Sequence, residues 1–113
     1  MLKASELKAI ESYLSGMENV SVSYPHSKTI AVYSLQNTPF AYLETSKQLY
    51  RLSLRADARL GQLLKDKYEE VLSGQKLNPK LWITIVLSGQ LSSQEIIDLI
   101  NHSYQLAALE AQL

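Results

Sequence analysis

The sequence predicts a two-layer α+β domain, in which helices cover one face of a largely antiparallel sheet. Three segments repeat apolar residues at helical spacing, and the stretch between the first two alternates with the period of strands. The 113 residues include 46% hydrophobic side chains and no cysteine, so a packed core rather than disulfides must stabilise the fold. At this length we expect residues 1–113 to form one domain.

The first helix is predicted over about residues 4–17. Its apolar stripe recurs every three or four positions and consists of Leu7, Ile10, Leu14 and Met17. Ser5 is expected to cap the amino end, with Glu6 at the positive end of the helix dipole. Gly16 is expected to end the helix.

A three-stranded meander is predicted to follow, with strands at residues 29–35, 40–44 and 48–54. Residues 20–24 form either a further short strand or an extended lead-in. Asn37 favours a turn, and Pro39, which has no N–H, is expected at the start of its strand. Phe40 and Tyr42 are expected to share a face, either as core residues or as a platform for stacked bases.

A second helix is predicted to begin after Asp57, a good N-cap residue, and to end before the break at residues 73–75. Its apolar side is expected to consist of Leu60, Leu63, Leu64, Tyr68 and Val71.

Residues 81–87 form the strongest predicted strand, and their apolar character predicts a central position in the sheet. Trp82 points away from Ile83 and Ile85, and either packs under a loop or stays exposed for a partner. Ser92 and Glu95 form a predicted capping box for a last helix over about residues 93–111. That helix is expected to bury Ile96, Leu99, Ile100 and Ala107.

Motifs for catalysis or metal binding are missing from the sequence. The two histidines, His26 and His102, have no second histidine or cysteine nearby, so we expect no metal site. The four glycines stand too far apart for a phosphate-binding loop, and no G-x-S-x-G element marks a nucleophilic serine. The carboxylates are expected on exposed helix faces, without a paired acid and base. We therefore expect a non-enzymatic protein with no catalytic residues and no cofactor.

The sequence also bears on location and partners. It contains neither a secretory signal nor the run of about 20 apolar residues that a membrane helix requires, so we expect a cytoplasmic monomer without a membrane partner. The formal net charge is zero, but residues 47–80 hold eight basic and four acidic side chains. This basic middle is either a scattered, solvated set of charges or a surface for an anionic partner.

Several segments, taken in order, carry a family resemblance: Leu52-Ser53-Leu54-Arg55-Ala56-Asp57, then Leu63 and Tyr68, then Leu77-Asn78-Pro79-Lys80-Leu81-Trp82-Ile83-Thr84-Ile85, then Leu87-Ser88-Gly89, and finally residues 95–104 ending in Ser103-Tyr104. Together they resemble the MmcQ/YjbR family of small bacterial proteins. The resemblance implies the order α-β3-α-β2-α, similar to type III secretion chaperones, and a short strand around residues 71–76. Asn78, Ser103 and Tyr104 match the family, and we expect structural roles for all three.

The family is commonly labelled DNA-binding, by analogy with a double-wing architecture. The resemblance therefore implies double-stranded DNA as a partner, held by a basic sheet and loop surface. The residues that would form this surface are Arg51, Arg55, Lys76, Lys80 and Trp82. Pro79, Leu81 and Ile83 stand where the family often has Lys, His and Asn, which removes polar groups from it.

Two other functions are weighed beside DNA binding. One is a chaperone-like protein-interaction module, with no affinity for nucleic acid, that uses the exposed sheet or the region of Trp82. The other is a small enzyme or ligand binder, which a deep pocket lined by Trp82 and Tyr104 would indicate.

Overall fold

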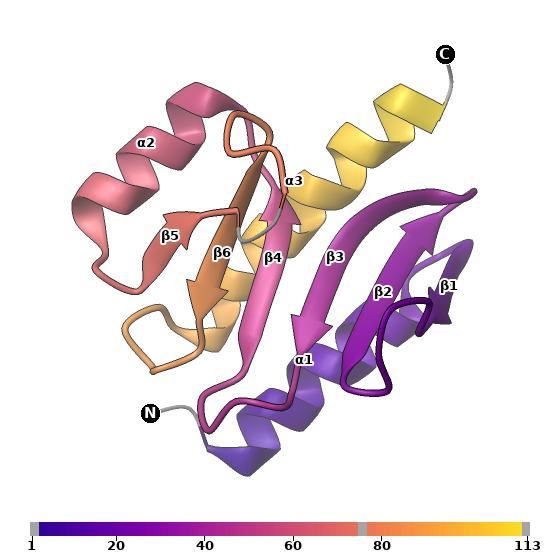
Figure 1. The fold of residues 1–113 in the computed structure, drawn as a ribbon, viewed down its shortest axis with the longest axis horizontal. Helices are drawn as coiled ribbons and strands as arrows, with labels where there is room; N and C mark the ends of the chain where they lie inside the picture. Colours follow the sequence, from indigo (N-terminus) through magenta and orange to yellow (C-terminus); the bar gives the residue numbers. More distant parts are fainter. Residues whose placement is uncertain (1–2, 75–76, 112–113) are drawn as a thin grey trace.

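The chain folds into a six-stranded antiparallel sheet with three helices (Figure 1). The computed structural model describes residues 3–74 and 77–111. In chain order the elements are α1 (Ala4–Gly16), β1 (Val20–Ser23), β2 (Ile30–Leu35), β3 (Thr38–Glu44), β4 (Arg51–Arg55), α2 (Ala58–Lys67), β5 (Val71–Ser73), β6 (Trp82–Val86) and α3 (Ser93–Ala111). The strand order across the sheet is β1-β2-β3-β4-β6-β5, so β6 is internal, as predicted.

The α+β class is confirmed, but the element order differs from the implied α-β3-α-β2-α. Four strands rather than three precede α2, because residues 20–23 pair with β2 from Val20↔Leu35 to Ser23↔Val32. Backbone pairing with a neighbour thus decides between the two interpretations that the sequence left open. The short strand implied around residues 71–76 is present as β5, and residues 75–76 lie outside the described part of the chain.

All three helices pack on one face of the sheet. This face presents Leu52 and Leu54 of β4 beside Ile83 and Ile85 of β6, which are all buried. Helices α1 and α3 lie behind the sheet in Figure 1, and their buried residues Ile10, Leu14, Ile96, Ile100 and Ala107 join the same core. Helix α2 reaches this face at Gly61, where a Cβ atom would lie 3.3 Å from the Ile83 Cγ2 atom. The two-layer prediction therefore holds.

Local capping signals were mostly predicted correctly. The Asp57 carboxylate accepts the Leu60 N–H at 2.8 Å, and Ser92 and Glu95 exchange hydrogen bonds at 3.0 and 3.1 Å before α3. The expectation for Ser5 was wrong, because the N-cap of α1 is Lys3, two residues earlier. The Glu6 carboxylate accepts the Lys3 N–H at 3.1 Å, so a side chain already provides the cap there.

Helix α2 is shorter than predicted. It ends at Lys67, and Tyr68 follows as its C-cap residue. Leu63 was expected on the apolar side but is exposed, because α2 faces the sheet through Gly61 with Leu60 and Leu64 packed against the core. Leu81 is also exposed, since β6 starts one residue later.

A β-bulge separates Phe40 from Tyr42. The β2–β3 register shifts between Tyr33 and Ser34, leaving Phe40 without a partner in the ladder. Phe40 is fully buried against Tyr104 of α3, with ring centroids 5.6 Å apart, whereas Tyr42 contacts Trp82. The expectation that Phe40 and Tyr42 share a face was therefore wrong, and the two rings cannot form one stacking platform.

Candidate interaction surface

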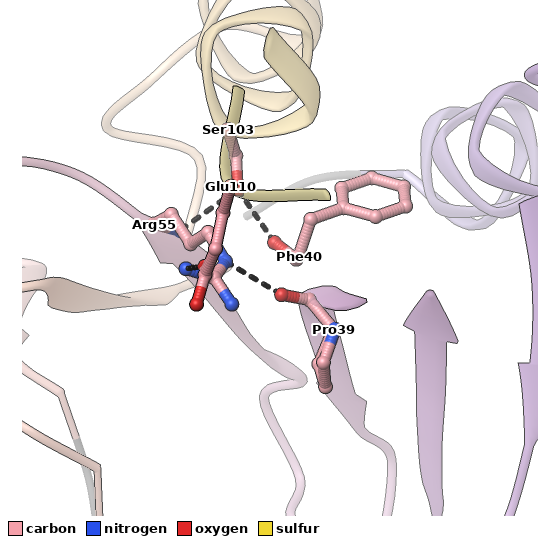
Figure 2. Close-up of polar contacts among 5 residues, drawn as sticks. All are labelled: Pro39, Phe40, Arg55, Ser103 and Glu110. Carbon is pink, nitrogen blue, oxygen red and sulfur yellow. Dashed lines mark hydrogen bonds and ion pairs between the residues drawn. The ribbon is translucent and has the colours of Figure 1, made fainter. Parts of the chain in front are cut away.

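Arg55, one of the candidates for contacting an anionic partner, is engaged within the molecule (Figure 2). Its guanidinium forms an ion pair with Glu110 near the carboxyl end of α3, and its Nε donates to the Pro39 carbonyl at 2.6 Å. The Arg55 side chain is 16% exposed, whereas that of Glu110 is 56% exposed. The charge of Arg55 is thus neutralised by a neighbouring acid and is largely withdrawn from solvent.

Ser103 connects α3 to the sheet directly beside this ion pair. The β3–β4 ladder ends at Ala41↔Leu54, and the Ser103 hydroxyl spans the next gap between the two strands. Its Oγ accepts the Arg55 N–H at 2.8 Å and donates to the Phe40 carbonyl at 2.6 Å (Figure 2). The structural role expected for Ser103 is confirmed.

Trp82 packs against the rest of the sheet and is not displayed to a partner. It is 7% exposed, and the Arg55 Cζ atom lies 5.0 Å from its ring centroid, a cation–π distance. The Tyr42 ring meets it edge-on, with centroids 5.3 Å apart. Trp82 lies on the face opposite Ile83, while Tyr104 packs on Phe40 on the helical side. The two residues therefore do not line a common pocket.

Unlike Arg55, neither Arg51 nor Lys80 forms an ion pair within the described residues. Arg51 lies at the other end of β4, on the same face as Arg55. It is half-buried, and its Nε has no hydrogen-bond partner within residues 3–74 and 77–111. Lys80 is exposed in the turn before β6. The structure therefore brings only Arg55 and Trp82 into direct contact, and Lys76 lies outside the described residues.

The turn that carries Lys80 is built by Asn78. The Asn78 carbonyl accepts the N–H groups of Leu81 and Trp82, at 3.1 and 3.0 Å. Its side-chain Oδ1 accepts the Lys80 N–H at 3.0 Å. Asn78 thus directs the chain into β6, and the structural role expected for it is confirmed.

The YjbR family model matches residues 15–106 of this chain. The chain belongs to the YjbR family. The uncharacterised protein YjbR of Escherichia coli K12 is 29% identical to it over 73 residues, a match that covers 65% of this chain and 62% of the curated relative. The match thus spans less than two thirds of that relative's length.

Two solved structures share the fold of this YjbR-family chain. The Deinococcus radiodurans protein DR2400 superposes with a TM-score of 0.80 at 22% identity, covering 88% of this chain and 76% of that one. A Pseudomonas syringae protein superposes with a TM-score of 0.75 at 22% identity, covering 94% and 99% of the two chains. At this level of identity the likeness establishes the fold alone.

Glu110 and Glu70 are the two acidic residues whose roles the sequence did not reveal. Glu110 lies two helical turns after Ser103, a spacing that places both side chains on one side of α3. Glu70 was expected on an exposed helix face but is buried. Its carboxylate accepts the N–H groups of Ser88 and Leu91 and the Ser88 hydroxyl. It thereby fixes the loop between β6 and α3, and the expectation for it was wrong.

Strand β1 is the exposed edge of the sheet. It has one neighbour, β2, and three of its four residues are exposed. Val22 is 47% exposed, and Tyr24, directly after the strand, is 56% exposed. The strand contains no charged residue and no proline, the features that commonly protect an edge from pairing.

The described residues contain neither a cluster of metal-binding side chains nor a membrane-spanning helix. Within residues 3–74 and 77–111, no three side chains of the types that bind metals come together. In the same part of the chain, no helix combines the length and the apolar character that crossing a bilayer requires.

Proposed function

We propose that this YjbR-family chain is a non-enzymatic protein-interaction domain, and that β1 accepts an extended segment of its partner. The observation that carries this proposal is the unpaired edge of β1. An edge strand presents backbone N–H and C=O groups that another strand can pair with, which is the mode of recognition called β-augmentation. The partner is therefore identified by its chemistry, as a protein segment in the extended conformation.

The side chains around β1 favour such a partner. Val22 and Tyr24 are exposed at the edge and offer apolar contact to alternate residues of an added strand. The opposite edge is less suitable, because β5 has only three residues and Val71 within it is buried. The two edges therefore differ in length, exposure and accessible backbone.

The distribution of charge supports a protein partner over a polyanion. Binding to DNA depends on basic side chains that neutralise phosphates. The ion pair with Glu110 engages Arg55, and the formal net charge of the chain is zero. Fewer cations are then available for phosphates than the sequence predicted.

Double-stranded DNA is the second candidate partner, favoured by one observation. The Arg51 Nε is buried without a hydrogen-bond partner in the described residues, and Lys80 is exposed in the turn before β6, near the opposite end of β4. These two residues would provide the phosphate contacts of a basic sheet and loop surface.

Peptide selection tests the edge directly. Peptides that bind the full chain are selected from a displayed library of random sequences. The affinity of each selected peptide for the unchanged chain and for two variants is then measured by fluorescence anisotropy. Val22→Lys puts a charge on the edge, whereas Leu63→Lys changes an exposed apolar residue on α2 as a matched control. We expect most binders to lose affinity for Val22→Lys and to keep it for Leu63→Lys. Binders that tolerate Val22→Lys as well as Leu63→Lys would contradict the proposal.

The same assay with a labelled DNA duplex tests the second candidate. DNA binding would appear as affinity that falls with salt, with a logarithmic slope of about −0.9 for each phosphate neutralised. Loss of that affinity in Arg51→Gln, with no change in Val22→Lys, would favour DNA over a protein partner. We expect no saturable duplex binding at tens of micromolar protein.

A further inference from the structure

A small cavity lies at one end of the sheet, on the helical side. Its lining includes residues of α1, of the connection from β1 to β2 and of the connection from β3 to β4. Both connections lie at the lower end of the sheet in Figure 1. Its volume is about 220 Å³. Buried Ala31, Tyr33 and Leu43 line it, so part of the wall is apolar.

Two opposite charges line the cavity without neutralising each other. Glu11 comes from α1 and is half-buried, and Lys28 comes from the β1–β2 connection and is exposed. Within residues 3–74 and 77–111, neither side chain forms an ion pair or a hydrogen bond. The cavity therefore offers a carboxylate and an ammonium group to one ligand.

Tyrosine hydroxyls add neutral hydrogen-bonding groups. Tyr24 and Tyr50 line the cavity, and neither hydroxyl has a hydrogen-bond partner in the described part of the chain. Burial raises the pKa of Tyr33, a shift partly offset by the Ser15 hydroxyl and increased by electrostatic interaction with Glu11 and Tyr24. The Tyr33 phenol therefore remains neutral at physiological pH and adds no negative charge to the wall.

We propose that this cavity binds a small zwitterion of the free amino-acid class. The ligand's ammonium group lies at Glu11 and its carboxylate at Lys28, while its side chain packs on Ala31 and Leu43. The cavity is smaller than the roughly 300 to 1,000 Å³ of pockets for drug-sized ligands, which favours a molecule of this size. Charge-assisted hydrogen bonds at both ends would select for a ligand carrying both charges. The site shares Tyr24 with the surface around β1 but uses none of the backbone groups of that strand, and it goes beyond the proposed function.

Calorimetric titration of the full chain with L-leucine, L-phenylalanine and L-glutamine tests the proposal. We expect saturable binding of at least one of them below about 10 mM, a weak affinity in keeping with a small ligand. The same titration with the amide and the N-acetyl form of that amino acid removes one charge at a time. Each should bind about tenfold more weakly, which corresponds to about 1.4 kcal/mol.

Variants assign the two charged ends. Glu11→Gln and Lys28→Gln should each weaken binding about tenfold. Glu18→Gln and Lys8→Gln, exposed residues outside the cavity, should leave binding unchanged. Lack of saturable binding by all three amino acids would overturn the proposal. The proposal would also be overturned if the amide bound as tightly as its parent amino acid, or if neither Glu11→Gln nor Lys28→Gln weakened binding.

Discussion

Replacing Ser103 with alanine should remove the bridge that joins α3 to two strands. Ser103 is fully buried, and its hydroxyl bonds the Arg55 N–H at 2.8 Å and the Phe40 carbonyl at 2.6 Å. Without the hydroxyl, a backbone donor and a backbone acceptor lose this partner inside the protein. Each unsatisfied buried group costs about 1 to 3 kcal/mol, so losing both should lower the free energy of unfolding by about 2 to 6 kcal/mol.

Urea denaturation followed by circular dichroism measures this loss. Domains of this kind are stable by only about 5 to 15 kcal/mol, so the midpoint should fall clearly while the slope of the transition stays the same. Gln105→Ala is the matched control, because Gln105 is exposed on the same helix. A loss below about 0.5 kcal/mol for Ser103→Ala, the range typical of surface substitutions, would refute the reasoning.

Three further predictions concern single contacts. Glu110→Gln should lower the free energy of unfolding by less than about 1 kcal/mol, because the ion pair is partly exposed and Arg55 keeps the Pro39 carbonyl and the Trp82 ring. A double-mutant cycle with Arg55→Lys measures the coupling, and a value of several kcal/mol would contradict this estimate. Gly74→Ala should destabilise the protein by about 1 to 3 kcal/mol, because the new Cβ would lie 2.7 Å from the Trp82 Cβ; an unchanged melting temperature would contradict it. Hydrogen bonds from Ser92 and Tyr68 hold the pKa of Glu95 below its ordinary value. The folded state therefore binds fewer protons, and the stability contributed by Glu95 is lost as the pH falls below about 5. Glu95→Gln should flatten this part of the stability profile, and an unchanged acid limb would argue against the cause given.

Features encoded within a few neighbouring residues could be predicted from the sequence. The caps at Asp57 and Ser92 depend on a side chain that reaches N–H groups within three residues, so the local pattern is sufficient. The internal position of β6 follows from its continuous apolar character. At the first helix the local pattern was misread, because the Glu6 carboxylate provides the cap that was assigned to Ser5.

Features that depend on distant parts of the chain could not be predicted in this way. The bulge that sends Phe40 into the core arises from the register with β2, which alternation within one strand does not specify. The pairing of Arg55 with Glu110 joins residues 55 positions apart, and it turns a candidate phosphate contact into an internal ion pair. The cavity likewise takes its charges from α1 and from the β1–β2 connection, and no local sequence pattern indicates that these two segments meet.

Hydrogen exchange of the β1 amides tests the central claim most directly. The full chain is measured alone and with a selected peptide bound, and exchange is followed by mass spectrometry along the whole chain. We predict that exchange slows at Val20–Ser23 when the peptide binds, because its backbone pairs with the outer edge of β1. Slowing confined to the residues around Arg51 or around Lys80, with β1 unchanged, would contradict the account.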